Sequence, residues 1–185
     1  MISAIILAGG NSTRMGSDKA SLKYLGERFI DRIVSVVSEF ADDVIVVSDR
    51  KYDRLVNCRQ VPDKVKDSGP LGGLCSGLYY STTVRNLVLS CDVPLFTREI
   101  LDVLLEQDAD EYDVVLPEVN GRLMPLVALY KQRALISLEN DLSAGRLKLT
   151  DAVMKLNVCK VALQSVMHQQ ITNVNTKEDY NLLLK

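Results

Sequence analysis

Short runs of apolar residues alternate along this chain with segments in which apolar residues recur at helical spacing. The segments predicted to be strands are 4–7, 44–47, 87–89 and 114–116, and a further short strand is predicted at 171–174. The segments predicted to be helices are 27–40, 71–81, 98–106, 148–154 and 177–184. Strands with continuous apolar stretches are typical of a parallel sheet that helices cover on both faces. The alternation therefore predicts an α/β fold with a doubly wound, mostly parallel sheet.

One dipeptide interrupts this order. Asn120 and Gly121 form the strongest short-range signal for a β-hairpin, and residues 126–130 are expected to return as its second strand. We expect this hairpin to be a small insertion over the active face of the sheet. Thr97 is expected to cap the helix 98–106. No linker, repeat or low-complexity segment divides the sequence, so residues 1–185 are expected to form a single domain.

The turn after the first predicted strand carries the most informative chemistry. Residues 5–20 read Ile-Ile-Leu-Ala-Gly-Gly-Asn-Ser-Thr-Arg-Met-Gly-Ser-Asp-Lys-Ala. Gly9 and Gly10 have no Cβ, so the backbone can turn sharply there and come close to a ligand. Arg14 and Lys19 add two cations beside backbone N–H groups. This combination predicts a phosphate-binding loop.

The loop fits neither of two standard glycine motifs. A Walker A loop requires a lysine directly after its last glycine, but here Ser17 follows Gly16. The dinucleotide fingerprint Gly-x-Gly-x-x-Gly fails because Gly9 and Gly10 are adjacent. The second failure disfavours a nicotinamide-dependent oxidoreductase, and two cations suit a triphosphate better. A non-catalytic nucleotide-binding regulator remains an alternative.

Asp92 is the candidate metal ligand. It follows the predicted strand 87–89, so it is expected at a carboxyl strand end, on the same edge of the sheet as Gly9 and Gly10. A single carboxylate there can hold Mg²⁺, which takes one or two carboxylates together with phosphate oxygens and waters. Asp92 could instead cap the following helix, but Thr97 is the better placed cap.

These residues carry a resemblance to a known family. The segments Leu7-Ala-Gly-Gly10, Ser12-x-Arg14-Met15-Gly16 and Asp18-Lys19 resemble the signature of nucleotidyltransferases that couple NTPs to phosphorylated acceptors, most closely the molybdenum cofactor guanylyltransferases. Further matches follow in the family's order: Val61-Pro-Asp63, Gly69-Pro-Leu-Gly-Gly73, and the segment from Asn173 to Tyr180. Met124 departs from the family's usual Gln or His before proline, which puts a polar contact to the acceptor in doubt.

The resemblance implies a Rossmann-like nucleotidyltransferase fold and a reaction that transfers GMP from GTP to the terminal phosphate of molybdenum-molybdopterin, releasing pyrophosphate. It implies that Arg14, Lys19 and Asp92 are catalytic and that Asp92 binds Mg²⁺. The residues implied to bind GTP are Leu7, Ala8, Gly9, Gly10, Lys19, Asp63 and Asp92. Asn173 and Asn175 are implied to bind molybdopterin, although Asn175 or Thr176 can also cap the helix 177–184.

Alternatives with the same chemistry are cytidylyl transfer to molybdopterin and nucleotidyl transfer to a sugar or polyol phosphate. A carboxylate such as Asp63 suits guanine because it can accept from both N1–H and the N2 amino group. The residues alone do not decide which group recognises the base. The resemblance also implies contacts with other proteins of molybdenum cofactor synthesis and with the apo-enzymes that receive the cofactor.

Composition narrows the remaining function classes. Of 185 residues, 22 are basic and 24 acidic, and no basic stripe predicts nucleic-acid binding. The initial apolar run is too short for a signal peptide or a membrane span, so no membrane contact and a cytoplasmic location are expected. His168 is the only histidine, which leaves no Ser-His or Cys-His catalytic pair with further support.

Overall fold

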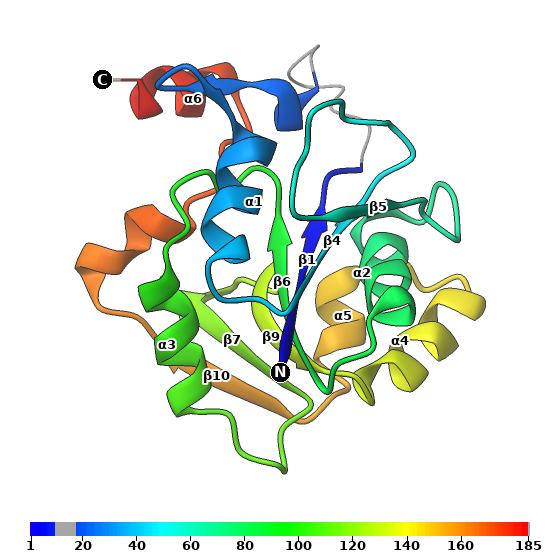
Figure 1. Ribbon diagram of the computed structural model, residues 1–185. Helices are drawn as coiled ribbons and strands as arrows, with labels where there is room; N and C mark the ends of the chain where they lie inside the picture. Colours follow the sequence, from blue (N-terminus) through cyan, green and yellow to red (C-terminus); the bar gives the residue numbers. More distant parts are fainter. Residues whose placement is uncertain (10–17, 185) are drawn as a thin grey trace.

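The computed structural model describes residues 1–9 and 18–184 of the chain, and a mixed, largely parallel sheet lies at its centre (Figure 1). The strand order is β10-β7-β9-β6-β1-β4-β5. These strands, in that order, are Val158–Ala162, Val114–Val119, Val127–Lys131, Arg85–Ser90, Ile2–Leu7, Asp43–Val47 and Arg59–Val61. β2 (Lys23–Tyr24) and β3 (Glu27–Arg28) form a separate small ribbon.

Helices cover both faces of the sheet, as the alternation predicted (Figure 1). One face carries α1 (Phe29–Ser38) and α3 (Arg98–Glu106), and the other carries α2 (Gly69–Tyr80), α4 (Ala134–Ser143) and α5 (Leu149–Val153). The central strand shows why both faces are apolar. Ala4 and Ile6 pack in the core beneath α1 and α3, whereas Ile5 and Leu7 pack in the core beneath α2 and α4. Successive side chains of a strand point to opposite faces, so a strand buried on both sides is apolar throughout.

Helix α2 packs unusually close to β1. A Cβ built on Gly77 would lie 2.2 Å from Ile5 Cγ2, so this position admits only glycine at the present spacing. The strand below is fully buried at Ile5, which leaves its side chain little room to move away. The glycines of α2 therefore let the helix lie against the central strand.

The predicted hairpin is confirmed at Asn120 and Gly121, whose φ angles are 51° and 75°. These values are those that a tight hairpin turn requires. The return strand is split in two: β8 (Arg122–Leu123) pairs with the end of β7, and β9 pairs antiparallel with both β7 and β6. Residues 126–130 were expected to lie over the active face, but most of them form β9 inside the main sheet.

The prediction of a strand at 171–174 is wrong, whereas Thr97 occupies the predicted N-cap position of α3 without making the expected side-chain bond. Residues 165–171 form a short 3-10 helix, η2 (Ser165–Ile171), and no strand follows within the described residues. Ile171 and Val174 are buried although they lie in no strand, and a run this short gives the same apolar pattern for a strand and for an anchored loop. Thr97 precedes α3, but its hydroxyl contacts Gln170 Oε1 at 3.0 Å and makes no cap bond.

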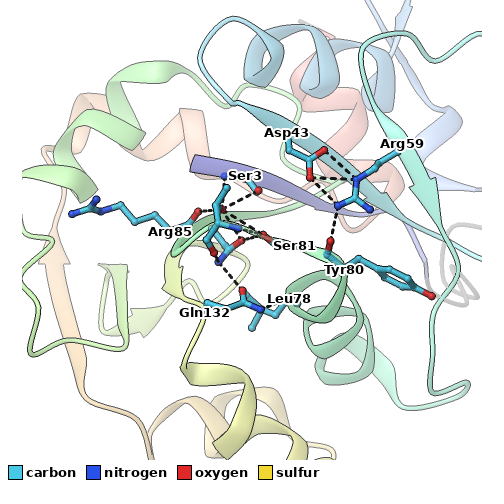
Figure 2. Close-up of polar contacts among 10 residues, drawn as sticks. Ser3, Asp43, Arg59, Leu78, Tyr80, Ser81, Arg85 and Gln132 are labelled. Atoms are coloured by element: carbon cyan, nitrogen blue, oxygen red, sulfur yellow. Dashed lines mark hydrogen bonds and ion pairs between the residues drawn. The ribbon is translucent and has the colours of Figure 1, made fainter. Parts of the chain in front are cut away.

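A polar network holds the edge of the sheet at the amino end of β1 (Figure 2). The Ser3 amide donates to Thr83 Oγ1 at 3.0 Å, and the buried Asn86 contacts Ser81 and Gln132. Gln132 in turn donates to the Leu78 carbonyl of α2 at 2.7 Å. Buried polar groups that are satisfied in this way cost little, so this network ties the amino ends of β1 and β6 to α2 with little loss of stability.

Among the described residues, no helix combines the length and the apolar character that a membrane span requires.

Candidate functional site

The candidate site lies where β1 and β6 end side by side. Leu7 pairs with Ser90 in the parallel register, and the Cys91 amide donates to the Leu7 carbonyl at 3.0 Å. Ala8 and Gly9 therefore leave the sheet beside Asp92. The expectation that the glycine turn and Asp92 share one sheet edge is confirmed at Gly9, whereas Gly10 and Arg14 lie outside the described residues.

Lys19 brings two distant segments together at this edge. Asp18 caps the short 3-10 helix η1 (Lys19–Ser21) by accepting from the Ala20 amide. From this helix the Lys19 ammonium reaches Asp92 Oδ2 at 3.0 Å and Asn175 Oδ1 at 2.6 Å. The side chains of Lys19 and Asp92 are only 18% and 10% exposed, so solvent screens this ion pair only in part.

Asp92 is the carboxylate at this edge that could take a metal ion. Its Oδ1 is buried and has no hydrogen-bond partner among the described residues. An unpaired buried carboxylate oxygen is costly, which makes it a strong candidate for a hard cation. In the part of the chain that is described, no group of three or more His, Cys, Asp or Glu side chains gathers around such a cation. Asp92 can thus supply one protein ligand, and substrate oxygens and waters would have to supply the others.

Asp63 lies apart from this cluster, just after β5. Its Oδ1 accepts from Ser76 Oγ at 2.7 Å and from the Val65 amide at 3.2 Å. A Cβ built on Gly73 would lie 3.6 Å from Leu7 and 4.0 Å from Asp63 Oδ2, so Leu7 and Asp63 both approach this glycine. No hydrogen bond joins Asp63 to Lys19, Asp92 or Asn175 in the described structure.

The two asparagines near the C-terminus have different surroundings. Asn173 Oδ1 is buried and unpaired within the described residues, whereas Asn175 Oδ1 holds Lys19. The cap of α6 (Lys177–Leu183) is Thr176, whose side chain accepts from the Asp179 amide. Backbone N–H groups of Asn175 and Thr176 donate to Asp179 Oδ2 and hold the pKa of that carboxyl below its usual value. The cap leaves the Asn175 side chain free to turn toward Lys19.

Tyr52 is a site residue that the sequence did not reveal. Its hydroxyl lies 3.0 Å from the Ala8 carbonyl and 3.3 Å from Asp18 Oδ1, so it links the residue that follows β1 to the residue that caps η1. Burial and the neighbouring Asp18 raise the pKa of Tyr52 well above its usual value, which keeps the hydroxyl protonated. No local pattern around residue 52 signals this contact, because its partners are distant in sequence.

Known proteins resemble this chain in sequence and in fold. The family described as "MobA-like NTP transferase domain" matches residues 4–156. A protein of Bacillus anthracis named "Probable molybdenum cofactor guanylyltransferase" is 34% identical, covering 95% of this chain and 92% of that protein. A Flavobacterium johnsoniae protein of the same name is 29% identical, covering 97% and 95%.

A solved structure has the same fold. Molybdopterin-guanine dinucleotide biosynthesis protein A of Archaeoglobus fulgidus superposes with a TM-score of 0.83 at 21% identity, covering 98% of this chain and 96% of that one. The family match ends at residue 156, before the segment that carries Asn173 and Asn175.

Proposed function

The chain belongs to the MobA-like NTP transferase family and is a nucleotidyltransferase, and on that premise we propose that it transfers GMP from GTP to the terminal phosphate of molybdenum-molybdopterin. The observation that carries the proposal is the Lys19–Asp92 pair at the carboxyl edge of the sheet, where Asp92 Oδ1 is buried and has no partner in the described part of the chain. A cation and a carboxylate with a free oxygen are what a metal-bound triphosphate requires.

The reaction needs alignment and charge neutralisation more than acid–base chemistry. A phosphate oxygen of the acceptor attacks the α-phosphorus of GTP, a new P–O bond forms, and the bond to the bridging oxygen of the β-phosphate breaks. Pyrophosphate leaves with the electron pair. The second pKa of a phosphate monoester is about 6, so the nucleophile is already ionised at neutral pH and needs no general base. The enzyme's main task is therefore to hold two anions together.

The proposed roles divide between the two strand ends. Lys19 would hold the triphosphate and the departing pyrophosphate, together with Arg14, which lies outside the described residues. Asp92 would hold Mg²⁺, and its unpaired Oδ1 fits that role. When bound, Mg²⁺ would neutralise charge on the α-phosphate and on the leaving group.

The nucleoside would lie along the turn after β1. Leu7, Ala8, Gly9 and the undescribed Gly10 would approach it through their backbone, and Asp63 would contact the guanine. Ser76 and the Val65 amide already occupy Asp63 Oδ1, so Oδ2 is the oxygen best placed to accept from the base. With Oδ1 occupied, Asp63 does not offer both of its oxygens to the two guanine donors, so cytidylyl transfer remains the alternative to test.

The acceptor would bind near Asn173 and Asn175. We propose that residues 1–185 act as one nucleotidyltransferase domain, because Asn175 contacts Lys19. The two relatives' names concern molybdenum cofactor synthesis, which supports molybdenum-molybdopterin as the acceptor. We also propose that the enzyme acts in the cytoplasm, where GTP is available, beside the proteins that make and receive the cofactor.

The test is a nucleotide panel followed by a transfer assay. GTP with Mg²⁺ should raise the melting temperature more than CTP, UTP, ATP or NAD at equal concentration, because ligand binding to the native state alone stabilises it. Pyrophosphate release should then require GTP, Mg²⁺ and molybdenum-loaded molybdopterin together. Equal or greater stabilisation by CTP would contradict the guanine assignment and favour the cytidylyltransferase.

A further inference from the structure

We propose that Asn175 is a positioning residue for the nucleotide side of the site: it orients the Lys19 ammonium toward the phosphates of the NTP. This inference rests on the proposed function for Lys19 and goes beyond the acceptor role proposed for Asn175. Its basis is the contact of 2.6 Å between Asn175 Oδ1 and Lys19 Nζ, which joins residues 156 positions apart in the sequence.

The two partners of Lys19 differ in charge. A lysine ammonium has three N–H donors, and in this structure Asp92 and Asn175 each accept one of them. Asp92 is negative and offsets the positive charge, whereas the Asn175 amide oxygen is neutral. Asn175 can therefore restrict the long, flexible lysine side chain while leaving its charge for an anionic ligand. Within residues 1–9 and 18–184 the third N–H has no acceptor, so it could take a phosphate oxygen.

The C-terminal segment is anchored to both halves of the site, which lets it act in this way. The Val174 amide donates to the Asp92 carbonyl at 2.8 Å, so the residue before Asn175 is tied to the metal-ligand segment. The Tyr180 hydroxyl donates to the Lys23 carbonyl at 2.6 Å, which ties α6 to the chain just after η1. Asn175 lies between these two anchors, and the Asp179 carboxylate fixes its backbone N–H.

An acceptor role and an orienting role of Asn175 predict different effects on nucleotide binding. If Asn175 served the acceptor alone, its loss would leave nucleotide binding unchanged in the absence of acceptor. If it orients Lys19, its loss must weaken the nucleotide even when no acceptor is present. The effect must also depend on the phosphates and on Lys19, since those are the partners through which it acts.

The experiment is a double-mutant cycle with Asn175→Leu and Lys19→Ala. The Kd for GTP is measured for each variant by isothermal titration calorimetry in the presence of Mg²⁺ and in the absence of acceptor. Leucine has the same number of side-chain heavy atoms as asparagine and the same branching at Cγ, but it is bulkier and cannot accept a hydrogen bond. We expect Asn175→Leu to raise the Kd for GTP roughly three- to tenfold, which is the range for losing one ordinary hydrogen bond and suits a contact that solvent reaches. In the Lys19→Ala background, Asn175→Leu should cause no further rise.

Two controls separate this role from a structural one. Guanosine has no phosphate, so its Kd should be the same for Asn175→Leu and the wild type, whereas a distorted site would weaken both ligands. Asn181→Leu alters an exposed asparagine of the same C-terminal segment and should leave the Kd for GTP unchanged. An unchanged Kd for Asn175→Leu, a parallel loss of guanosine binding, or effects that multiply in the double variant would each overturn the proposal.

Failure of this proposal can be told apart from failure of the proposed function. The wild type is first titrated with GTP and CTP, and the cycle is run with whichever nucleotide binds more tightly. A preference for CTP would refute the guanine assignment and leave the Asn175 test intact, with cytidine in place of guanosine as the phosphate-free control.

Discussion

Replacing Asp92 with asparagine tests the centre of the site. Asn keeps the shape of the side chain but removes the charge that pairs with Lys19 and that would hold Mg²⁺. We expect the transfer rate to fall by a factor of about 10², the usual loss for a single electrostatic contact made in the transition state. That factor corresponds to about 2.7 kcal/mol of activation free energy. The apparent affinity for Mg²⁺ should fall as well.

The fold should survive this change. The Lys19–Asp92 pair spans 3.0 Å and both side chains retain some exposure, so it lies between surface pairs and fully buried ones. We expect a loss of about 1–2 kcal/mol in the free energy of unfolding, partly offset because Asn175 still accepts from Lys19. For a chain of this size such a loss lowers the melting temperature by about 2–8 °C.

The assay is pyrophosphate release with GTP and molybdenum-loaded molybdopterin across a Mg²⁺ titration, beside a circular dichroism melt. Asp151→Asn is the matched control, since Asp151 pairs with Lys148 at 2.8 Å but both side chains are largely exposed. The control should be active and stable. Turnover of Asp92→Asn within threefold of wild type, with an unshifted Mg²⁺ dependence, would refute the metal role. A collapsed melt would show that Asp92 is mainly structural.

Two further predictions concern the scaffold. Gly77→Ala should lower the free energy of unfolding by about 1–3 kcal/mol, because the new Cβ would lie 2.2 Å from Ile5 Cγ2. Urea unfolding measures this loss, and Gly73→Ala, whose nearest neighbour would lie at 3.6 Å, is the control that should not show it. The buried Asp108 pairs with Lys131 at 2.7 Å, and this pairing and Arg85 outweigh the burial that would raise its pKa, so the pKa is lowered. The stability that this lowered pKa contributes is complete above the unfolded pKa of about 3.9 and is lost as pH falls through the lower folded value. Lys131→Met should therefore lower the free energy of unfolding at pH 7, and this loss should become smaller below about pH 4 in urea titrations.

The elements predicted correctly from the sequence are those with strong local patterns. The strands β1, β4 and β6 each contain a continuous apolar stretch because both of their faces are covered, and α3 is predicted at its exact bounds. The hairpin turn at Asn120 and Gly121 follows from the backbone conformation that these residues tolerate. The hydrophobic pattern does not predict α4, β5 or β10. β5 is short, and only one of its residues, Val61, is buried.

The sequence by itself determined the glycine turn, the position of Asp92 at a carboxyl strand end and the family signature, because each depends on neighbours in the chain. Only the tertiary structure decided that β9 enters the sheet between β6 and β7, since strand order depends on long-range pairing. The same holds for the contacts of Tyr52 with Ala8 and of Lys19 with Asn175. The residues in each pair are far apart in the chain, and a local sequence pattern cannot predict a contact that only tertiary packing creates.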